Sequence, residues 1–397
     1  MLYLDRVSPF IGNRNAKVFV GIRRCGKSTL MDMTAERILA ADPDANIIRI
    51  NMEFMDSAPL RDVRAFYDYV KGRLAAGRRN CLFVDEIQDI GDWEKAIRSL
   101  IAEDCCDIYI SGSNSHMLSG EYSTYLSGRL NTISVQPLTY RECLMFRERY
   151  EGDEDVFGEY LRRGGFPLIW TMNLSDESAM SALSDIHSTV VLKDIIKRHD
   201  IRSTGTLDRL VLFLCDNVGK STSPFNIYNK MHSEGDPIGK DTLYSYIDHL
   251  EEACFIRKTK RYDLKGKRLL ESEYKYYLTD LGLKYAVMGF RKDDISGHIE
   301  NVLFNELTTR GYDVSIGKLG GNEIDFIASK AGKRMYIQAT YLISSDAVVE
   351  REFGNLKRID DGYPRYVIGM DPFWKSGDDV DGIVYRDLKE FLTADDW

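Results

Sequence analysis

The sequence contains no apolar run close to the ~20 residues that a transmembrane helix requires. Its first residues lack the basic segment and apolar core that mark a signal peptide. It has no C-x-x-C pair, and its seven cysteines are an odd number, so we expect free thiols rather than disulfides or zinc. The net charge of −9 argues against a protein that coats nucleic acid. We therefore expect a cytoplasmic protein with no membrane contact.

Residues 21–28 read GIRRCGKS, which fits the P-loop pattern G-x-x-x-x-G-K-S. An apolar strand pattern precedes the motif and a helical pattern follows it, an arrangement that directs backbone N–H groups at a phosphate. Lys27 is expected to contact the β- and γ-phosphates and Ser28 to bind Mg²⁺, while the N–H groups around Cys25 could lower its pKa. The expected nucleotide-binding residues are Gly21, Ile22, Arg23, Arg24, Cys25, Gly26, Lys27, Ser28 and Thr29.

A second motif supports the first. Residues 81–84 form an apolar run that predicts a buried parallel strand, and Asp85 and Glu86 follow it directly. Ligands of open α/β sheets bind at this carboxyl end of the strands. Asp85 is therefore expected to hold the Mg²⁺ shell, and Glu86 to orient and deprotonate the attacking water.

Two further residues are candidates for catalysis. The predicted strand 108–111 is followed by GSNS, so a polar side chain such as Asn114 could contact the γ-phosphate or the water, although these are also ordinary turn residues. Arg129 precedes another predicted strand and could act as an arginine finger on the nucleotide of a neighbouring subunit. The alternative for Arg129 is a solvated surface side chain.

The pattern of elements changes twice along the chain. Up to about residue 145, five predicted strands alternate with helical patterns such as 63–76, which indicates a parallel sheet with helices on both faces. From 146 to 285 short helices dominate, and three of them precede a predicted hairpin, the order of a winged helix. From 286 a helix and several strands predict a small α/β domain. The five strands of the first part are predicted at 17–20, 47–51, 81–84, 108–111 and 132–135.

The predicted hairpin is rich in basic residues. It suits contacts to nucleic-acid phosphates, although lysines also protect a solvated edge strand. Four acidic residues of the candidate recognition helix 241–253 would repel a phosphate backbone, and winged helices also contact proteins. The basic residues are Arg257, Lys258, Lys260, Arg261, Lys265, Lys267 and Arg268.

Several stretches together resemble the prokaryotic AAA-type (AAA+) P-loop ATPases that carry an uncharacterised C-terminal domain. The resemblance covers nearly the whole chain and implies ATP and Mg²⁺ as ligands, a polar sensor at Ser113 or Asn114, a finger at Arg129, and a lid arginine at Arg162 or Arg163. It leaves the oligomer open, a homo-oligomer included. The stretches are GIRRCGKST, CLFVDEIQ, ISGSNSHMLSG, YLSGRLNTISVQPLTYREC and YLRRGGFP.

The last part of the chain is similar in layout to the restriction-endonuclease-like core. Glu300 lies on a predicted helix and Asp325 on a strand, where such a core places its Mg²⁺ ligands. Gln338 and Thr340 stand where a carboxylate and the catalytic lysine are expected, although Lys330 or Lys333 could reach the site. We therefore favour an inactive relative of that core.

These observations predict a fold and a function. The fold is an α/β P-loop sheet domain (1–145), a helical lid with a winged-helix module (146–285) and a nuclease-like α/β domain (286–397). The expected function is Mg²⁺-dependent ATP hydrolysis that drives a switch or motor on a DNA or protein client bound through 200–285 and 286–397. The alternative is an ATP-gated nuclease that uses Glu300 and Asp325.

Overall fold

The computed structural model describes residues 2–115, 126, 128–147, 155–172, 174–236, 238–289 and 295–396. The chain divides into two compact units. Unit 1 comprises Met1–Val135 with Glu252–Cys254, and unit 2 comprises Gln136–Glu251 with Phe255–Trp397. No helix within the described ranges is both long enough and apolar enough to pass through a bilayer.

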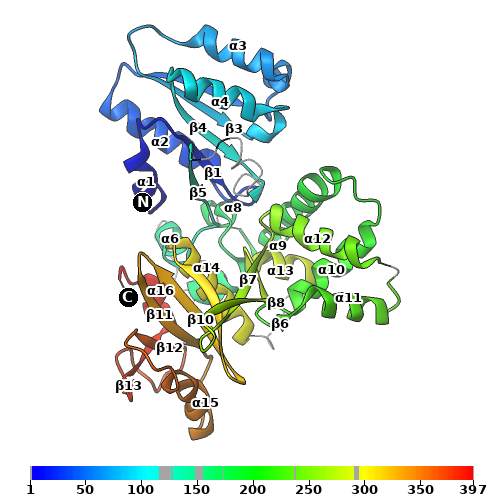
Figure 1. Cartoon of the computed structure of the whole chain (residues 1–397), viewed down its shortest axis with the longest axis vertical. Helices are drawn as coiled ribbons and strands as arrows, with labels where there is room; N and C mark the ends of the chain where they lie inside the picture. Colours follow the sequence, from blue (N-terminus) through cyan, green and yellow to red (C-terminus); the bar gives the residue numbers. More distant parts are fainter. Residues whose placement is uncertain are drawn as a thin grey trace. The chain divides into compact units, whose positions relative to one another are not determined.

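Unit 1 is built on a parallel sheet. In the described part of the chain this sheet has five strands in the order β2-β3-β4-β1-β5, and every neighbouring pair is parallel. The prediction of a parallel α/β sheet is confirmed, and each predicted strand lies within two residues of an observed one (Figure 1). The strands are β1 (Ala16–Val20), β2 (Asn46–Asn51), β3 (Asn80–Asp85), β4 (Asp107–Gly112) and β5 (Leu130–Ser134).

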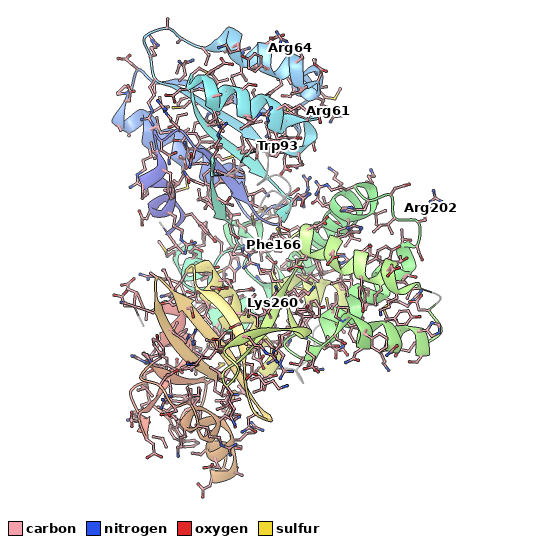
Figure 2. All side chains as sticks on the ribbon, viewed as in Figure 1. Arg61, Arg64, Trp93, Phe166, Arg202 and Lys260 are labelled. Atoms are coloured by element: carbon pink, nitrogen blue, oxygen red, sulfur yellow. The ribbon has the colours of Figure 1, made fainter. Side chains whose placement is uncertain are left out.

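The helices of unit 1 bury apolar faces against this sheet. Phe66 and Val70 of α3 are fully buried, and Ile97 and Leu100 of α4 share the same core cluster. Trp93, labelled in Figure 2, is the first residue of α4 and also joins this cluster. The helical elements are α1 (Leu2–Val7), η1 (Ser8–Phe10), α2 (Lys27–Ala41), η2 (Met55–Arg61), α3 (Val63–Arg73), η3 (Ile87–Asp89) and α4 (Trp93–Glu103).

The first part of unit 2 is helical, as expected. The three predicted small helices correspond to α10, α11 and α12, and the predicted apolar face of α12 is buried. The elements are α6 (Tyr140–Arg147), α7 (Val156–Arg163), α8 (Pro167–Thr171), α9 (Asp176–Thr189), a π-helix η5 (Val190–Lys197), α10 (Thr204–Asp216), β6 (Ser221–Thr222), α11 (Pro224–Ser233) and α12 (Lys240–Glu252).

The second part of unit 2 is a mixed sheet with helices. Within the described residues the strand order is β13-β14-β12-β11-β10-β9-β7-β8-β6. The elements are β7 (Ile256–Asp263), β8 (Arg268–Leu278), α13 (Leu281–Met288), α14 (Ile295–Thr309), β9 (Asp313–Leu319), β10 (Asn322–Lys330), β11 (Lys333–Ala339), α15 (Asp346–Lys357), β12 (Arg365–Gly369), β13 (Asp379–Val380), β14 (Ile383–Asp387) and α16 (Leu388–Thr393).

The hairpin β7–β8 is part of this larger sheet. β7 pairs with β8 on one side and, at Arg261 to Asp263, with β9 on the other. At residues 261–263 β7 therefore has a neighbour on each side. Arg257 to Lys260 pair with β8 alone among the described strands, so the alternative of a solvated edge strand stays a prediction there. The boundary between the second and third domains, placed at 285/286 from the sequence, stays a prediction.

Candidate functional site

The P-loop connects β1 to α2 in the predicted way. Gly26 is the N-cap of α2 and has a φ of +105°, a conformation that a residue with a Cβ rarely adopts. Gly21 lies against the end of β5, where an added Cβ would be 2.1 Å from the carbonyl oxygen of Val135. The loop therefore requires glycine at both positions. The first N–H groups of α2 have no acceptor inside the helix, which makes this end suitable for an anion.

Lys27 lies over the loop and is buried. Its ammonium donates hydrogen bonds to the carbonyl oxygens of Gly21 (3.0 Å) and Ile22 (3.2 Å). The same Nζ lies 4.0 Å from Oε1 of Glu86. The structure thus brings Lys27 and Glu86, two residues predicted to be catalytic, to one side of the P-loop.

The two predicted Mg²⁺ ligands are in direct contact. The hydroxyl of Ser28 donates to Oδ2 of Asp85 over 2.5 Å. Both residues line a hollow of about 450 Å³, together with Met31, Asn51 and Phe83. A hydroxyl and a carboxylate are hard oxygen ligands of the type that Mg²⁺ binds, so this donor set fits the ion that a P-loop implies.

Ser111 is a site residue that the sequence reasoning missed. Its hydroxyl, which has no solvent exposure, donates to Oδ1 of Asp85 and accepts from the backbone N–H of Glu86 at 3.1 Å. Ser111 lies on β4, which is adjacent to β3 in the sheet. The available signal was one hydroxyl at the carboxyl end of an apolar strand. From the sequence alone, the polar contact of this strand is expected at residues beyond its end.

Glu86 follows β3 in a left-handed conformation, with a φ of 56°. Its carboxylate lies 3.8 Å from the Arg23 guanidinium and accepts a hydrogen bond from the side chain of Gln88. Arg23 also pairs with Glu53 at 2.6 Å. The carboxylate of Glu86 is therefore held by the P-loop and by η3 together.

The expectation for Cys25 was wrong. Its thiol is buried and donates to the carbonyl oxygen of Val135 at 3.5 Å. Burial raises the pKa of this thiol and outweighs the charge of Lys27. Cys25 is therefore a packing residue in the P-loop. All seven cysteines are free, as predicted.

Asn114 and Arg129, the other two predicted catalytic residues, lie just after β4 and just before β5. Asn114 is half-buried beyond the end of β4, while residues 116–120 of the same motif lie outside the described residues. Arg129 is exposed and precedes β5, whose first residue pairs with Ala16 at the start of β1. Because β1 and β5 are parallel, Arg129 lies at the amino-terminal end of these strands, whereas the P-loop of its own chain lies at their carboxyl-terminal end. Both catalytic roles stay predictions.

Unit 2 contains a separate cluster of charged side chains. Glu300 of α14 and Asp325 of β10, predicted as a pair, lie within 2.8 and 3.5 Å of the ammonium of Lys275 on β8. Lys330 donates instead to the carbonyl oxygen of Arg310, at 2.7 Å. The lysine of this cluster is therefore Lys275, which the sequence reasoning did not consider as a site residue.

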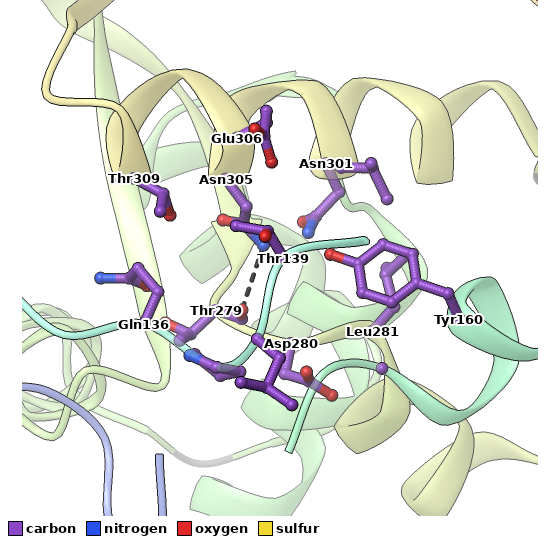
Figure 3. A pocket seen from close by; sticks show the side chains of 14 residues that line it. Gln136, Thr139, Tyr160, Thr279, Asp280, Leu281, Asn301, Asn305, Glu306 and Thr309 are labelled. Carbon is purple, nitrogen blue, oxygen red and sulfur yellow. Dashed lines mark hydrogen bonds between the residues drawn. The ribbon is translucent and has the colours of Figure 1, made fainter. Parts of the chain in front are cut away.

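A small cavity in unit 2 lies beside the glycine pair in YLRRGGFP and is lined by Gly164 and Asp280 (Figure 3). Its volume of about 20 Å³ is enough for a single water molecule. Asp280 accepts from the backbone N–H of Gly165 at 2.6 Å, and a Cβ on Gly164 would lie 1.8 Å from its Oδ1. Nearby, Asn305 donates to the carbonyl oxygen of Thr279 at 3.0 Å. The glycine pair thus allows close contact with α13.

Arg163, one of two candidates for a lid arginine, is held within unit 2. Its guanidinium donates to Asp176 from Nε (2.9 Å) and Nη2 (2.6 Å), and to the carbonyl oxygen of Leu174. Arg162 precedes it at the end of α7. The assignment of a sensor between these two arginines stays open.

Comparison with known protein families identifies two regions. Residues 13–144 match the family described as an AAA domain. Residues 154–294 match a domain of unknown function, DUF8612. The first match contains the P-loop, Asp85, Glu86 and Ser111, so it agrees with the geometry described above.

Among solved structures, the chain is similar to Aeropyrum pernix ORC1 in complex with DNA and to AMPPCP-bound DnaA from Aquifex aeolicus. The first has 13% identity and a TM-score of 0.34, and the likeness covers 72% of this chain and 91% of that one. The second has 13% identity and a TM-score of 0.33, with 63% and 86% covered. No conclusion about function follows from likenesses of this size.

Two curated relatives extend over most of the chain. An uncharacterized protein of Methanocaldococcus jannaschii is 26% identical, over 90% of this chain and 87% of its own length. An uncharacterized protein of Haemophilus influenzae is 33% identical, over 100% of this chain and 97% of its own length. This chain therefore belongs to the same protein family as the H. influenzae protein.

Proposed function

We propose that this protein is a Mg²⁺-dependent ATPase whose turnover drives a conformational switch or motor that acts on a bound partner. The observation that carries the proposal is the contact between Ser28 and Asp85, 2.5 Å apart beside the P-loop. These two oxygens come from different elements, and together they offer a hard cation a site next to the phosphate-binding amides. The match to the AAA domain family supports the same conclusion.

Each residue of the site has a separate task in this proposal. Lys27 and the N–H groups at the start of α2 bind the phosphates and offset their charge. Ser28 and Asp85 would hold Mg²⁺, which would supply positive charge to offset that of the phosphates. Glu86 orients the attacking water and accepts its proton, and Asn114 contacts the γ-phosphate or the water. Ser111 positions Asp85 and the backbone of Glu86.

Arg129 is proposed to act between subunits. Because it lies at the end of the strands opposite its own P-loop, it needs a second copy of the chain to approach a nucleotide. A guanidinium in that position stabilises charge that develops on the transferred phosphoryl group. The proposal therefore includes a homo-oligomer.

The partner is proposed to be a DNA or protein client of unit 2. The order α10, α11, α12, β7, β8 and the pairing of β6 with β8 support a winged-helix arrangement. The hairpin presents exposed Lys260, seen in Figure 2, with Lys265, Lys267 and Arg268. Arg261 is instead engaged by Glu273 and Glu323. Only part of the basic residues of the hairpin β7–β8 is therefore available to bind a client.

The remaining features of the proposal concern organisation. We propose that residues 146–285 include a helical lid and that residues 286–397 form an inactive nuclease-like domain. We also propose that the protein is cytoplasmic. The order α14, β9, β10, β11 supports the nuclease-like layout, because it carries Glu300 and Asp325 on the predicted elements.

Replacement of Glu86 by Gln tests the proposed chemistry. The amide cannot accept the proton of the attacking water, so Glu86→Gln should bind ATP with Mg²⁺ but release phosphate at least 100-fold more slowly. The matched control is Glu103→Gln, at the exposed end of α4, which should hydrolyse ATP at the wild-type rate. Wild-type phosphate release from Glu86→Gln would contradict the assignment. A client that co-purifies with ATP-loaded Glu86→Gln would identify the partner.

A further inference from the structure

Lys275 is a buried lysine in an unusual setting. It lies on β8 of the basic hairpin, but its side chain is only 3% exposed, and its ammonium is directed at three carboxylates. Nζ lies 2.8 Å from Oε2 of Glu300, 2.9 Å from Oε1 of Glu323 and 3.5 Å from Oδ1 of Asp325. These carboxylates come from two elements, α14 and β10, so the lysine joins the hairpin to both.

The ammonium of Lys275 is shared by three carboxylates, as a bound cation would be. An ammonium has three N–H donors, and here three carboxylates surround it. The remaining polar contacts hold the acids in place. The hydroxyl of Tyr277 donates to Glu300 at 3.2 Å, and the backbone N–H of Ala339 donates to Asp325 at 2.9 Å. The cluster is therefore organised around the point that Lys275 occupies.

Without Lys275, the negative charges of Glu300 and Asp325 would not be offset by the nearby arginines. Arg261 approaches Glu323 at 3.5 Å but also pairs with Glu273, and Arg351 is engaged by Glu352. Lys275 is thus the cation shared by Glu300 and Asp325 in the described part of unit 2. Burial and the charge of Asp325 raise the pKa of Glu300, as expected for a cluster with excess negative charge.

A further polar atom lies beside the cluster. The register that pairs Phe326 with Ile337 brings Gln338 opposite Asp325, on the same face of the sheet. Gln338 is 9% exposed, and its Oε1 is buried with no hydrogen-bond donor among the described residues. A buried amide oxygen without a donor is a ready ligand for a cation.

We propose that the Lys275 ammonium is the resident cation of this cluster and occupies the place that a divalent metal ion would otherwise take. Mg²⁺ and Mn²⁺ need the same carboxylate oxygens at close to 2.1 Å, and they cannot share them with an ammonium already bound there. The cluster is then a structural link between the hairpin and the C-terminal strands. It does not bind a divalent metal ion unless the lysine is removed.

The proposal is tested by counting bound Mn²⁺ on the full-length, nucleotide-free protein by equilibrium dialysis. Lys275→Met removes the charge and keeps the length of the side chain, and it should add one Mn²⁺ site per chain, with Glu300, Asp325 and Gln338 as ligands. The matched control is Lys260→Met, an exposed lysine of the same hairpin, which should bind as the wild type does. The added site should vanish in Lys275→Met combined with Asp325→Asn. A folded Lys275→Met that gains no Mn²⁺ overturns the proposal.

A second comparison does not depend on the folding of Lys275→Met. If the ammonium holds this position in the wild-type protein, wild type and Asp325→Asn should bind the same number of Mn²⁺ ions. Loss of one Mn²⁺ site in Asp325→Asn would show that the carboxylates bind metal with the lysine in place, and would overturn the proposal. Neither outcome concerns nucleotide hydrolysis, because no residue of unit 1 is altered.

Discussion

Ser111→Ala tests whether Asp85 and Glu86 are positioned for catalysis. Ser111 contacts both of these acidic residues and does not belong to the proposed phosphate-binding residues. Its buried hydroxyl is bonded to Asp85 and to the backbone N–H of Glu86. Alanine removes both bonds and alters little else. Asp85 then keeps its contact to Ser28 but loses the one that fixes its other oxygen.

The size of the effect follows from the bonds that are lost. A hydrogen bond to a charged group contributes about 1.5–3 kcal/mol. Loss of a residue that orients a metal ligand typically lowers affinity or activity about 10–100-fold. These ranges agree, because a 10–100-fold change in rate corresponds to about 1.4–2.7 kcal/mol. We therefore expect kcat/KM for ATP to fall about 10–100-fold, with a higher Mg²⁺ concentration for half-maximal activity.

The assay is phosphate release as a function of Mg²⁺ concentration. ATP binding in EDTA should be unchanged in Ser111→Ala, because Lys27 and the P-loop are intact. The matched control is Ser99→Ala, an exposed serine of α4 whose hydroxyl donates to the carbonyl oxygen of Lys95. If Ser111→Ala shows the wild-type rate and the wild-type Mg²⁺ dependence, the assignment of Asp85 and Glu86 as a positioned pair is refuted.

Two further predictions concern the oligomer and the C-terminal cluster. If Arg129 acts on a neighbouring subunit, specific activity should rise with protein concentration in the wild type and stay low and flat in Arg129→Ala; a flat wild-type dilution series would contradict this. Burial and Asp325 raise the pKa of Glu300 to about 8, so the folded protein retains a proton that the unfolded chain loses near pH 4.5. The free energy of unfolding should therefore fall as pH rises from about 4.5 to 8, and urea denaturation should show a shallower fall for Glu300→Gln. The same dependence on pH in the wild type and in Glu300→Gln would contradict the raised pKa of Glu300.

Much of the nucleotide site could be predicted from the sequence, because its signals are local. The P-loop is a contiguous motif, and its flanking strand and helix are encoded by the residues next to it. Asp85 and Glu86 follow directly after an apolar run. Periodicity located the five strands of unit 1 to within two residues, since each is a short buried run between turn signals.

The missed residues depend on contacts between distant segments. Ser111 is one hydroxyl at the end of a strand, and only the pairing of β3 with β4 places it beside Asp85. Lys275 was read as part of a hairpin, and its role depends on α14 and β10, which lie 25 and 50 residues further along the chain. The parallel pairing of β7 with β9 also has no local signal, because it joins segments separated by β8, α13 and α14. Such contacts are set by packing rather than by sequence pattern.

The central claim is that the P-loop binds ATP with Mg²⁺, and isothermal titration calorimetry of the nucleotide into the folded protein tests it most directly. The wild type and the control Lys95→Ala should both give a saturable binding isotherm. Lys27→Ala should give none, because the phosphates lose the ammonium that lies over the loop. An absence of binding heat with the wild type at several temperatures, or retained micromolar affinity in Lys27→Ala, would contradict the account.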